Sequence, residues 1–375
     1  MAGGDLQAPP RADELEISVF GPGYGECVVV HAANHQWLII DSCRGPSGRP
    51  AASEYLGGLG VDISTQVRLV IATHYHDDHI GGIGEVYEEC GVARFGCSTA
   101  LNTREWGTLI KIYRNYLQAA GSGIDELWRV MKALQKRAGD GEIVAPIFCI
   151  AGREVKEPVL ESPAQLTCLA PSDAAVAVMQ SRIREEILPK TQRRRLRVPT
   201  LQQNDSSVVL SLRVGAASVL LGADLEERGR GGLGWQVILS ALPPNYERHD
   251  GFKIPHHGSS TGYHPDVWPR LISPDGWAVV TPYNRQKLPL PTQLDCDRIL
   301  RMTSNAFITS PPGWAKFRHP DPAVQKTSQE ATLAIGPEQP KHGHVRFRRS
   351  IAAGAAWSTE LFGEAKALSS MQRAA

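Results

Sequence analysis

The chain has 375 residues, 42% of them hydrophobic, and a formal net charge of +1 at pH 7. This composition allows one large domain or two ordinary ones, and the net charge indicates no particular partner. No apolar run approaches the length of a membrane span, and residues 1–12 lack the apolar segment of a signal peptide. We therefore expect a cytoplasmic protein that does not contact a membrane.

The N-terminal part of the chain is rich in predicted strands. Residues 15–20 alternate in polarity, a glycine-rich turn follows over residues 21–26, and residues 27–30 and 37–40 are short β-rich runs. The last of these runs ends at Asp41, so a carboxylate is expected at the end of a buried strand.

The middle of the chain has a helical pattern instead. Apolar residues recur at helical spacing over residues 104–137, where residues 121–123 separate two helices, and again over residues 173–189. A strand-like piece lies between them at residues 143–150. The densest positive charge of the chain follows at residues 190–197.

Predicted strands return in the last part of the chain. They are expected at residues 207–214, 217–221, 252–255, 277–281 and 306–309. Two strand-rich parts around a helical middle predict an α/β sandwich with an insertion rather than two unrelated domains. The expected divisions are a flexible N-terminal tail at 1–14, one domain at 15–350 containing a helical and basic insertion at 101–199, and a C-terminal tail at 351–375.

The seven cysteines are widely spaced, and no Cys-x-x-Cys pair occurs among them. An odd number without metal-binding spacing argues against both a disulfide framework and a thiolate zinc site. We expect these thiols to be buried in apolar surroundings.

The densest group of potential metal ligands is the run His-Tyr-His-Asp-Asp-His at residues 74–79, directly after an apolar run. Imidazole nitrogens and carboxylate oxygens are ligands that zinc, manganese and iron accept. His74 and His76 can face the same side of an extended backbone, and Asp78 and His79 begin the following turn. One loop could thus supply two metal ions about 3.5–4 Å apart, the spacing used in two-metal hydrolases.

Further ligands have to come from the ends of other strands. Asp224 follows the predicted strand at residues 217–221 and is placed to bridge two ions, and His256 and His257 follow another strand. The sequence therefore predicts a site for one or two divalent transition-metal ions, zinc or manganese.

These motifs resemble a known family. His74-x-His76-x-Asp78-His79 followed by Gly81-Gly82 is similar to the signature of the metallo-β-lactamase fold. Asp41 resembles the first motif of that fold, and Asp224 resembles its bridging carboxylate. A narrower resemblance, to the soluble hydrolase domain of the competence-protein (ComEC-like, DNA-internalisation) branch, is carried by Gly23-Tyr24-Gly25-Glu26, Asn204-x-x-Ser207 and Pro255-His256-His257-Gly258-Ser259.

The resemblance, which covers about residues 15–100 and 200–335, implies an αββα sandwich with two metal positions. The ligands of one ion would be His74, His76 and Asp224. The ligands of the other would be Asp78, His79, Asp224 and one histidine of the 256–257 pair.

The resemblance also implies roles around the two positions. His257 is the favoured ligand because related motifs place a single histidine just before the glycine, which leaves His256 to face the substrate. Asp41 would orient a ligand histidine through its ring N–H.

One ligand that the resemblance implies is missing. No histidine lies between His79 and His249, and Asn204-Asp205-Ser206-Ser207 stands in the expected position. Asn204, Asp205 or water would then complete the first ion's coordination. The competence-protein branch shares the Asn-x-x-Ser pattern, so the missing histidine favours the resemblance to that branch.

Several residues near these motifs indicate an anionic substrate. The predicted substrate-binding residues are Ser259, Ser260, Lys253, Arg193, Arg194 and Arg195. Hydroxyls, backbone amides and an ammonium beside the histidine pair could bind phosphate, although the hydroxyls could equally cap the next helix. The arginine run would attract a polyanion, unless it is a solvated charge run in a linker.

Together these residues predict a metal-dependent hydrolase that cleaves phosphodiester bonds of nucleic acid or nucleotides through a metal-activated water. Asp78 and His256 would be its catalytic residues. One alternative is a lactone, thioester or small-phosphoester hydrolase on the same fold. A second is a non-catalytic, metal-stabilised interaction module whose insertion binds a protein partner; the sequence does not indicate the oligomeric state.

Overall fold

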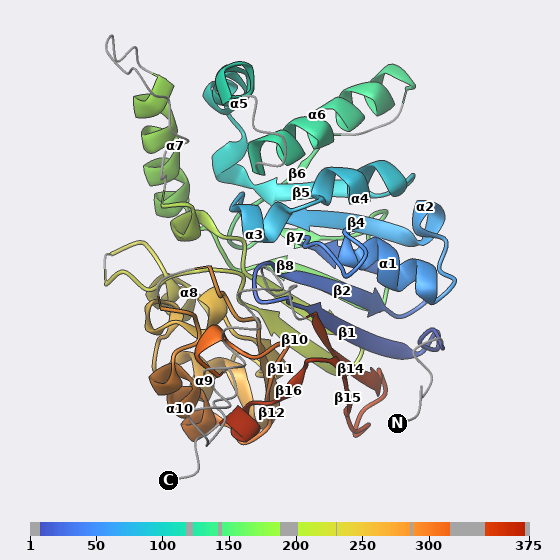
Figure 1. Cartoon of the computed structure of the whole chain (residues 1–375), viewed down its shortest axis with the longest axis vertical. Coiled ribbons are helices and arrows are strands. Elements are labelled where there is room, and N and C mark those ends of the chain that lie inside the picture. Colours follow the sequence, from blue (N-terminus) through green and yellow to red (C-terminus); the bar gives the residue numbers. More distant parts are fainter. Residues whose placement is uncertain are drawn as a thin grey trace, which may run out of the picture.

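The computed structural model describes residues 8–117, 123–141, 145–187, 202–229, 231–285, 288–315 and 342–371. Within these ranges the chain forms two mixed β-sheets of eight strands each, and helices cover the outer faces of both sheets (Figure 1). The predicted αββα sandwich is thus confirmed. All seven cysteines are buried and free, as expected.

The first sheet has the strand order β15-β14-β1-β2-β3-β4-β5-β6. Its strands are β1 (Glu14–Phe20), β2 (Cys27–Ala32), β3 (Trp37–Ile40), β4 (Val67–Ala72), β5 (Arg94–Ser98), β6 (Ile147–Cys149), β14 (Gly343–Ser350) and β15 (Ser358–Gly363). Strands β3 to β6 run parallel to one another, whereas β1 pairs antiparallel with β2 and β14.

The second sheet has the order β16-β13-β12-β11-β10-β9-β8-β7. Its strands are β7 (Glu154–Val155), β8 (Ala164–Cys168), β9 (Leu210–Val214), β10 (Ala217–Leu221), β11 (His249–Lys253), β12 (Ile272–Val280), β13 (Ala306–Ile308) and β16 (Lys366–Ala367). Strands β10 to β13 are parallel, and β9 pairs antiparallel with β10, in agreement with the strands expected at residues 207–214 and 217–221.

Alternate residues of the strands fill the space between the sheets. Leu15, Ile17 and Val19 of β1 belong to one buried cluster with Leu210 and Leu212 of β9. Since side chains of a strand point to opposite faces in turn, the intervening residues are left to pack against the helical layers. This alternation is the sequence pattern that predicts β1.

The helices form the two outer layers. Beside the first sheet lie α1 (Ala51–Gly58), α2 (Ile63–Gln66), α3 (Asp77–Ile80), α4 (Ile83–Glu89), α5 (Arg104–Leu117), α6 (Gly123–Gly139) and α7 (Asp173–Ile187). Beside the second sheet lie α8 (Trp235–Ala241), α9 (Val267–Leu271) and α10 (Gln293–Met302). Short 3₁₀ turns are η1 (Thr99–Leu101), η2 (Gln203–Ser206), η3 (His256–Gly258), η4 (Ser260–Gly262), η5 (Gly313–Ala315) and η6 (Leu368–Met371). Within the described ranges, every helix is too short or too polar to serve as a membrane span.

The expected insertion at 101–199 is not purely helical. Its helices α5, α6 and α7 gather at one end of the molecule (Figure 1), but β6 extends the first sheet and β7 and β8 extend the second. Trp106 and Ile110 of α5 and Leu127 and Val130 of α6 are buried in the same core as the first sheet's outer face. The strands of the insertion are therefore part of the two sheets, and its helices add to the layer outside the first sheet.

The C-terminal residues differ from the expected tail at 351–375. Residues Ser358–Gly363 pair with β14 as β15, and Lys366–Ala367 pair with β13 as β16. Leu368 is fully buried. Most side chains of β15 are exposed or half-buried because it lies at a sheet edge, so its sequence lacks the apolar alternation that indicates a strand.

Asp77 connects the histidine-rich run to the insertion. Its Oδ1 accepts a hydrogen bond of 2.6 Å from the backbone N–H of Gly123, the first residue of α6. A helix begins with unpaired N–H groups and a partial positive charge, so a carboxylate there satisfies a donor and the helix dipole. A side chain at Gly123 would come within 2.7 Å of the Tyr75 carbonyl oxygen, which explains the glycine.

Replacing Asp77 by alanine is expected to lower the free energy of unfolding by about 1 kcal/mol, because α6 loses its N-terminal acceptor. Chemical denaturation monitored by circular dichroism measures this loss. Asp77→Asn is the control because it keeps an acceptor oxygen, so its loss should be smaller. Equal losses for the two variants would contradict the capping role.

Candidate metal centre

The candidate site lies where strands of both sheets end. Strand β3 leads into Asp41, β4 into residues 73–79, β10 into Asp224, and β11 into residues 256–257. Strands β3 and β4 are parallel neighbours, as are β10 and β11, so in each pair the carboxyl ends open at one edge of the sheet. The packing of the two sheets brings the four loops together.

The backbone of these loops is strained in several places. Among the described residues, seven non-glycine residues have a positive φ, and four of them adjoin this site: Asp41 (60°), Ala223 (47°), His256 (47°) and His257 (53°). Side chains with a Cβ adopt this region rarely, and such strain concentrates at functional sites. The consecutive pair His256 and His257 turns the chain sharply after β11, so His257 points inward and His256 is partly exposed.

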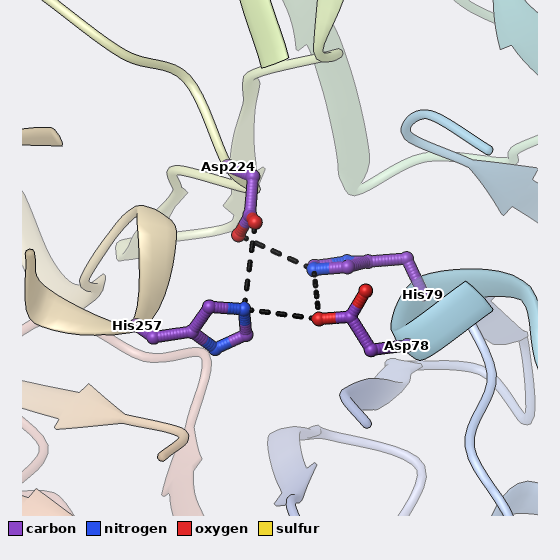
Figure 2. A group of neighbouring side chains, drawn as sticks. All are labelled: Asp78, His79, Asp224 and His257. Carbon is purple, nitrogen blue, oxygen red and sulfur yellow. Dashed lines mark hydrogen bonds and ion pairs between the residues drawn. The ribbon is translucent and has the colours of Figure 1, made fainter. Parts of the chain in front are cut away.

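Asp78, His79, Asp224 and His257 converge on one point (Figure 2). Nε2 of His79 lies 3.2 Å from Oδ1 of Asp224 and 3.8 Å from Oδ2 of Asp78. Nε2 of His257 lies 3.1 Å from Oδ2 of Asp78 and 3.4 Å from Oδ2 of Asp224. Metal–ligand bonds of about 2.0–2.2 Å place tetrahedral ligand atoms roughly 3.4 Å apart, so these separations suit one ion.

His74, His76 and Asp224 form a second group that shares the Asp224 carboxylate with the first. Nε2 of His74 lies 4.0 Å from Oδ2 of Asp224 and 3.0 Å from Nδ1 of His76. Oδ1 of Asp224 faces His79 of the first group, and Oδ2 faces both His257 of the first group and His74 of the second. Asp224 therefore lies within reach of both groups and is the one carboxylate that they share.

The histidine rings are fixed by hydrogen bonds at their other nitrogens. Nδ1 of His79 donates to Oδ2 of Asp41 over 2.7 Å, and Nδ1 of His257 donates to the Thr281 carbonyl oxygen over 3.1 Å. Asp41 is itself held by the backbone N–H and the hydroxyl of Thr73, each at 2.7 Å. Both Nε2 atoms are thus left directed at the carboxylates, as in histidines prepared to bind a metal.

The charges of the site are strongly coupled. Burial disfavours a charged ring, but Asp224, Asp41 and Asp78 outweigh it and raise the pKa of His79 well above its usual value. Burial likewise opposes charge on His257, yet Asp224 and Asp78 raise the pKa of His257 to about 9. Burial and the neighbouring rings of His79 and His76 instead lower the pKa of His74. The carboxylates therefore favour positive charge at the first group, while His74 stays a neutral donor.

Two buried atoms of the site lack hydrogen bonds. Nε2 of His79 and Oδ1 of Asp224 are both shielded from solvent, and neither has a hydrogen-bond partner among the described residues. The two atoms form an ion pair at 3.2 Å but no hydrogen bond, whereas buried polar atoms nearly always have a hydrogen-bond partner. A divalent cation between them would satisfy both, and the set of imidazoles and carboxylates suits zinc or manganese.

His256 lies beside the cluster rather than in it. Its Nδ1 is 2.7 Å from the Thr261 hydroxyl oxygen and 3.5 Å from Oε1 of Glu226. Its Nε2 is 3.3 Å from Nδ2 of Asn204, which also donates to Glu226 over 2.8 Å. Oδ1 of Asn204 is buried without a hydrogen-bond partner among the described residues. Asn204 and Glu226 thus position the His256 ring at the rim of the site.

Two predicted site residues have other partners. Both oxygens of Asp205 are bound by guanidinium groups, at 2.9 Å by Arg182 and at 3.0 Å by Arg228, so this carboxylate is not available to a metal. The Lys253 ammonium is buried against Glu26 and donates to the Ala223 carbonyl oxygen, so it does not face a substrate. Both corrections have one physical reason: a buried charge needs an opposite charge close by.

The hydroxyls after the histidine pair have different environments. Oγ of Ser259 accepts from the Thr261 backbone N–H and so caps η4, which is the structural alternative that the sequence left open. Ser260 is exposed at the same turn. Arg193, Arg194 and Arg195 lie outside the described residues.

Three contributors to this site were not anticipated from the sequence: Glu26, Glu226 and Thr281. Glu26 accepts from the Thr281 hydroxyl over 2.6 Å and belongs to a buried group with Asp41 and His79. None of the three follows a recognisable ligand spacing. The one available signal was a carboxylate at the end of the glycine-rich turn at residues 21–26.

Residues 20–128 match a sequence model of the family described as the Metallo-beta-lactamase superfamily. The matched segment carries Asp41 and residues 74–79 but ends before Asp224 and His257. No curated protein matches the chain. The two layered sheets, the matched segment and the clustered histidines and aspartates are consistent with a metallo-β-lactamase-type sandwich that carries a candidate metal centre.

Two solved structures align with part of this chain. The flavodiiron protein from Giardia intestinalis is 12% identical, with a TM-score of 0.28 over 54% of this chain and 34% of that chain. Zn(2+)-bound PqqB from Methylobacterium extorquens is 11% identical, with a TM-score of 0.29 over 61% of this chain and 56% of that chain. The aligned part therefore spans about a third of the first neighbour and just over half of the second.

Proposed function

We propose that this protein is a metal-dependent hydrolase that cleaves phosphodiester bonds of nucleic acid or nucleotides. The observation that carries the proposal is the sharing of Asp224 between two donor groups, one with His74 and His76 and one with residues 78, 79 and 257. Two adjacent cations bridged by one carboxylate are suited to an in-line displacement at phosphorus. The superfamily, which consists mostly of metal-dependent hydrolases, supports the hydrolytic part of the proposal.

Zinc or manganese, when bound, would supply Lewis acidity that lowers the pKa of water and offsets charge on a phosphate. Asp78, whose Oδ2 already accepts from His257, would accept the proton of the attacking water. Asp41 and the Thr281 carbonyl oxygen would keep the His79 and His257 rings in place. His256, partly exposed at the rim, would hydrogen-bond the leaving group.

The narrower assignment to the competence-protein branch belongs to the same proposal. Its support is the Asn204-x-x-Ser207 motif, whose Asn204 contacts His256 instead of contributing an imidazole ligand. Completion of the first ion's coordination by Asn204 or water is part of this proposal. The branch has nucleic-acid associations, so it agrees with a phosphodiester substrate.

The proposal is tested with purified protein dialysed against a chelator and then loaded with manganese or zinc. We expect metal-dependent hydrolysis of bis-(p-nitrophenyl) phosphate and of single-stranded DNA, and no hydrolysis after chelation. Asp78→Ala should lower the rate by about 10²–10⁴-fold, the usual contribution of a general base. Hydrolysis of lactones or thioesters with no phosphodiester cleavage would favour the alternative enzyme class. Absence of all hydrolysis in metal-loaded protein would favour the interaction module.

A further inference from the structure

We infer that Tyr24, Tyr283 and Arg285 form a nucleotide-binding wall beside the metal centre, which binds the base and phosphate next to the scissile bond. The inference rests on the proposed function and names the substrate contacts of that same site. None of these residues belongs to the ligand motifs, and they come from two loops more than 250 positions apart in the chain. We call these three residues the aromatic wall.

The aromatic wall begins at a metal-centre histidine. The Tyr283 ring lies 5.2 Å from the His257 ring, and the Tyr24 ring lies 5.4 Å from the Tyr283 ring. The Arg285 guanidinium carbon lies 3.5 Å from the centre of the Tyr24 ring, close enough for a cation–π contact. The order from the centre outward is therefore His257, Tyr283, Tyr24, Arg285.

The Arg285 side chain is exposed, and among the described residues no carboxylate pairs with it. Other arginines, such as Arg44 and Arg129, are bound by glutamates. A guanidinium stacked on an aromatic ring keeps its donors in a plane that fits a phosphate. Arg285 is thus held in place by Tyr24 with its donors available to an anion.

The rings of Tyr24 and Tyr283 are half-buried, so part of each ring remains accessible. Aromatic ring faces of this kind are suited to stacking with a nucleobase.

The wall is rigid because its two loops are bound to each other. Asn284 donates its backbone N–H to the Gly23 carbonyl oxygen over 2.7 Å and accepts from the Gly313 N–H over 2.7 Å. Tyr283 and Leu290 exchange backbone hydrogen bonds of 2.8 and 2.9 Å. Gly23 has a φ of 87°, and a Cβ there would lie 2.6 Å from Nδ2 of Asn284, so only glycine fits. A wall fixed before binding loses little freedom when substrate arrives.

The chemistry of the wall points to a nucleotide unit rather than to an isolated phosphate. Planar rings bind a base by stacking, and an arginine beyond them binds the adjoining phosphate. A small phosphodiester with one phosphate would reach the metal centre but leave Arg285 without an anion. The wall therefore predicts a preference for substrates that carry a second phosphate.

The direct test is binding of a short fluorescein-labelled single-stranded oligodeoxynucleotide to the metal-free full chain, measured by anisotropy over a range of salt. Arg285→Ala is expected to weaken binding about tenfold and to reduce the slope of log K against log salt by about 0.7, the value for one phosphate of a single strand. Tyr24→Phe should retain the affinity that Tyr24→Leu loses. Arg248→Ala, an exposed arginine just before β11 at its opposite end, should leave affinity and slope unchanged.

The kinetic test compares the metal-loaded enzyme on a dinucleotide with a terminal phosphate and on bis-(p-nitrophenyl) phosphate. Arg285→Ala should lower the ratio of kcat/KM for the two substrates about tenfold. An unchanged salt slope and an unchanged ratio would overturn the aromatic wall while leaving the hydrolase proposal intact. An Arg285-dependent slope in a protein that cleaves no phosphodiester would support the wall and overturn the hydrolase proposal.

Discussion

The Asp224→Ala protein is expected to bind manganese or zinc at least about 100-fold more weakly than the wild type and to lose its hydrolytic activity. Replacing a group that only orients a ligand costs about 10–100-fold in metal affinity, and Asp224 belongs to both donor groups, so its loss should exceed that range. Metal content after dialysis, measured by mass spectrometry, and titration calorimetry on the chelated protein check the expectation.

The matched control for this variant is Asp250→Asn. Asp250 is a partly buried carboxylate in the adjacent strand β11 that accepts from the Ser218 N–H and pairs with Arg349. Its loss should affect stability without changing metal content. If Asp224→Ala retained wild-type metal affinity while remaining folded by circular dichroism, the bridging role of Asp224 would be wrong.

The Lys253→Met protein is expected to be less stable than the wild type by about 3–5 kcal/mol, the cost of leaving one member of a buried ion pair without its partner. The Lys253 ammonium and the Glu26 carboxylate are 1% and 2% exposed, so water cannot replace the missing charge. Urea denaturation of the metal-free protein measures the effect apart from any contribution of bound metal.

A second substitution separates the ion pair from the volume of the side chain. In the double variant Lys253→Met, Glu26→Gln, no uncompensated charge remains, so most of the lost stability should return. The Thr281 hydroxyl can still donate to the amide oxygen of the new glutamine. A loss of less than about 1 kcal/mol in the single variant would contradict the role of this buried ion pair in stability.

The sequence predicts the strands and the metal-ligand loop well because both have short-range signals. The alternation in β1 and the hairpin of β9 and β10 can be read within a few residues. The clustering of residues 74–79 needs no knowledge of the rest of the fold. Their association with Asp224 was predicted from its position after a strand as well as from the family resemblance, and the structure brings the two together.

The predictions that were wrong concern residues whose role depends on partners far away in the sequence. Lys253 lies two residues before Pro255, so its position suggests phosphate binding, but Glu26, more than 200 positions away in the chain, determines where its ammonium lies. Asp205 is next to a ligand-like asparagine, yet the guanidinium groups of Arg182 and Arg228 bind it. Local spacing does not encode such long-range charge pairing, so side chains of the expected chemical type take structural roles instead.

The hydrogen bond between Asp77 and Gly123 has a consequence for protein engineering. Because α6 starts against the histidine-rich loop and its Leu127 and Val130 lie in the same core as Ile80, residues 104–141 cannot be excised as a cassette. A shortened chain would expose that apolar surface directly beside the candidate metal ligands. A graft of foreign helices into this position would have to keep an acidic side chain at 77 and a glycine opposite it.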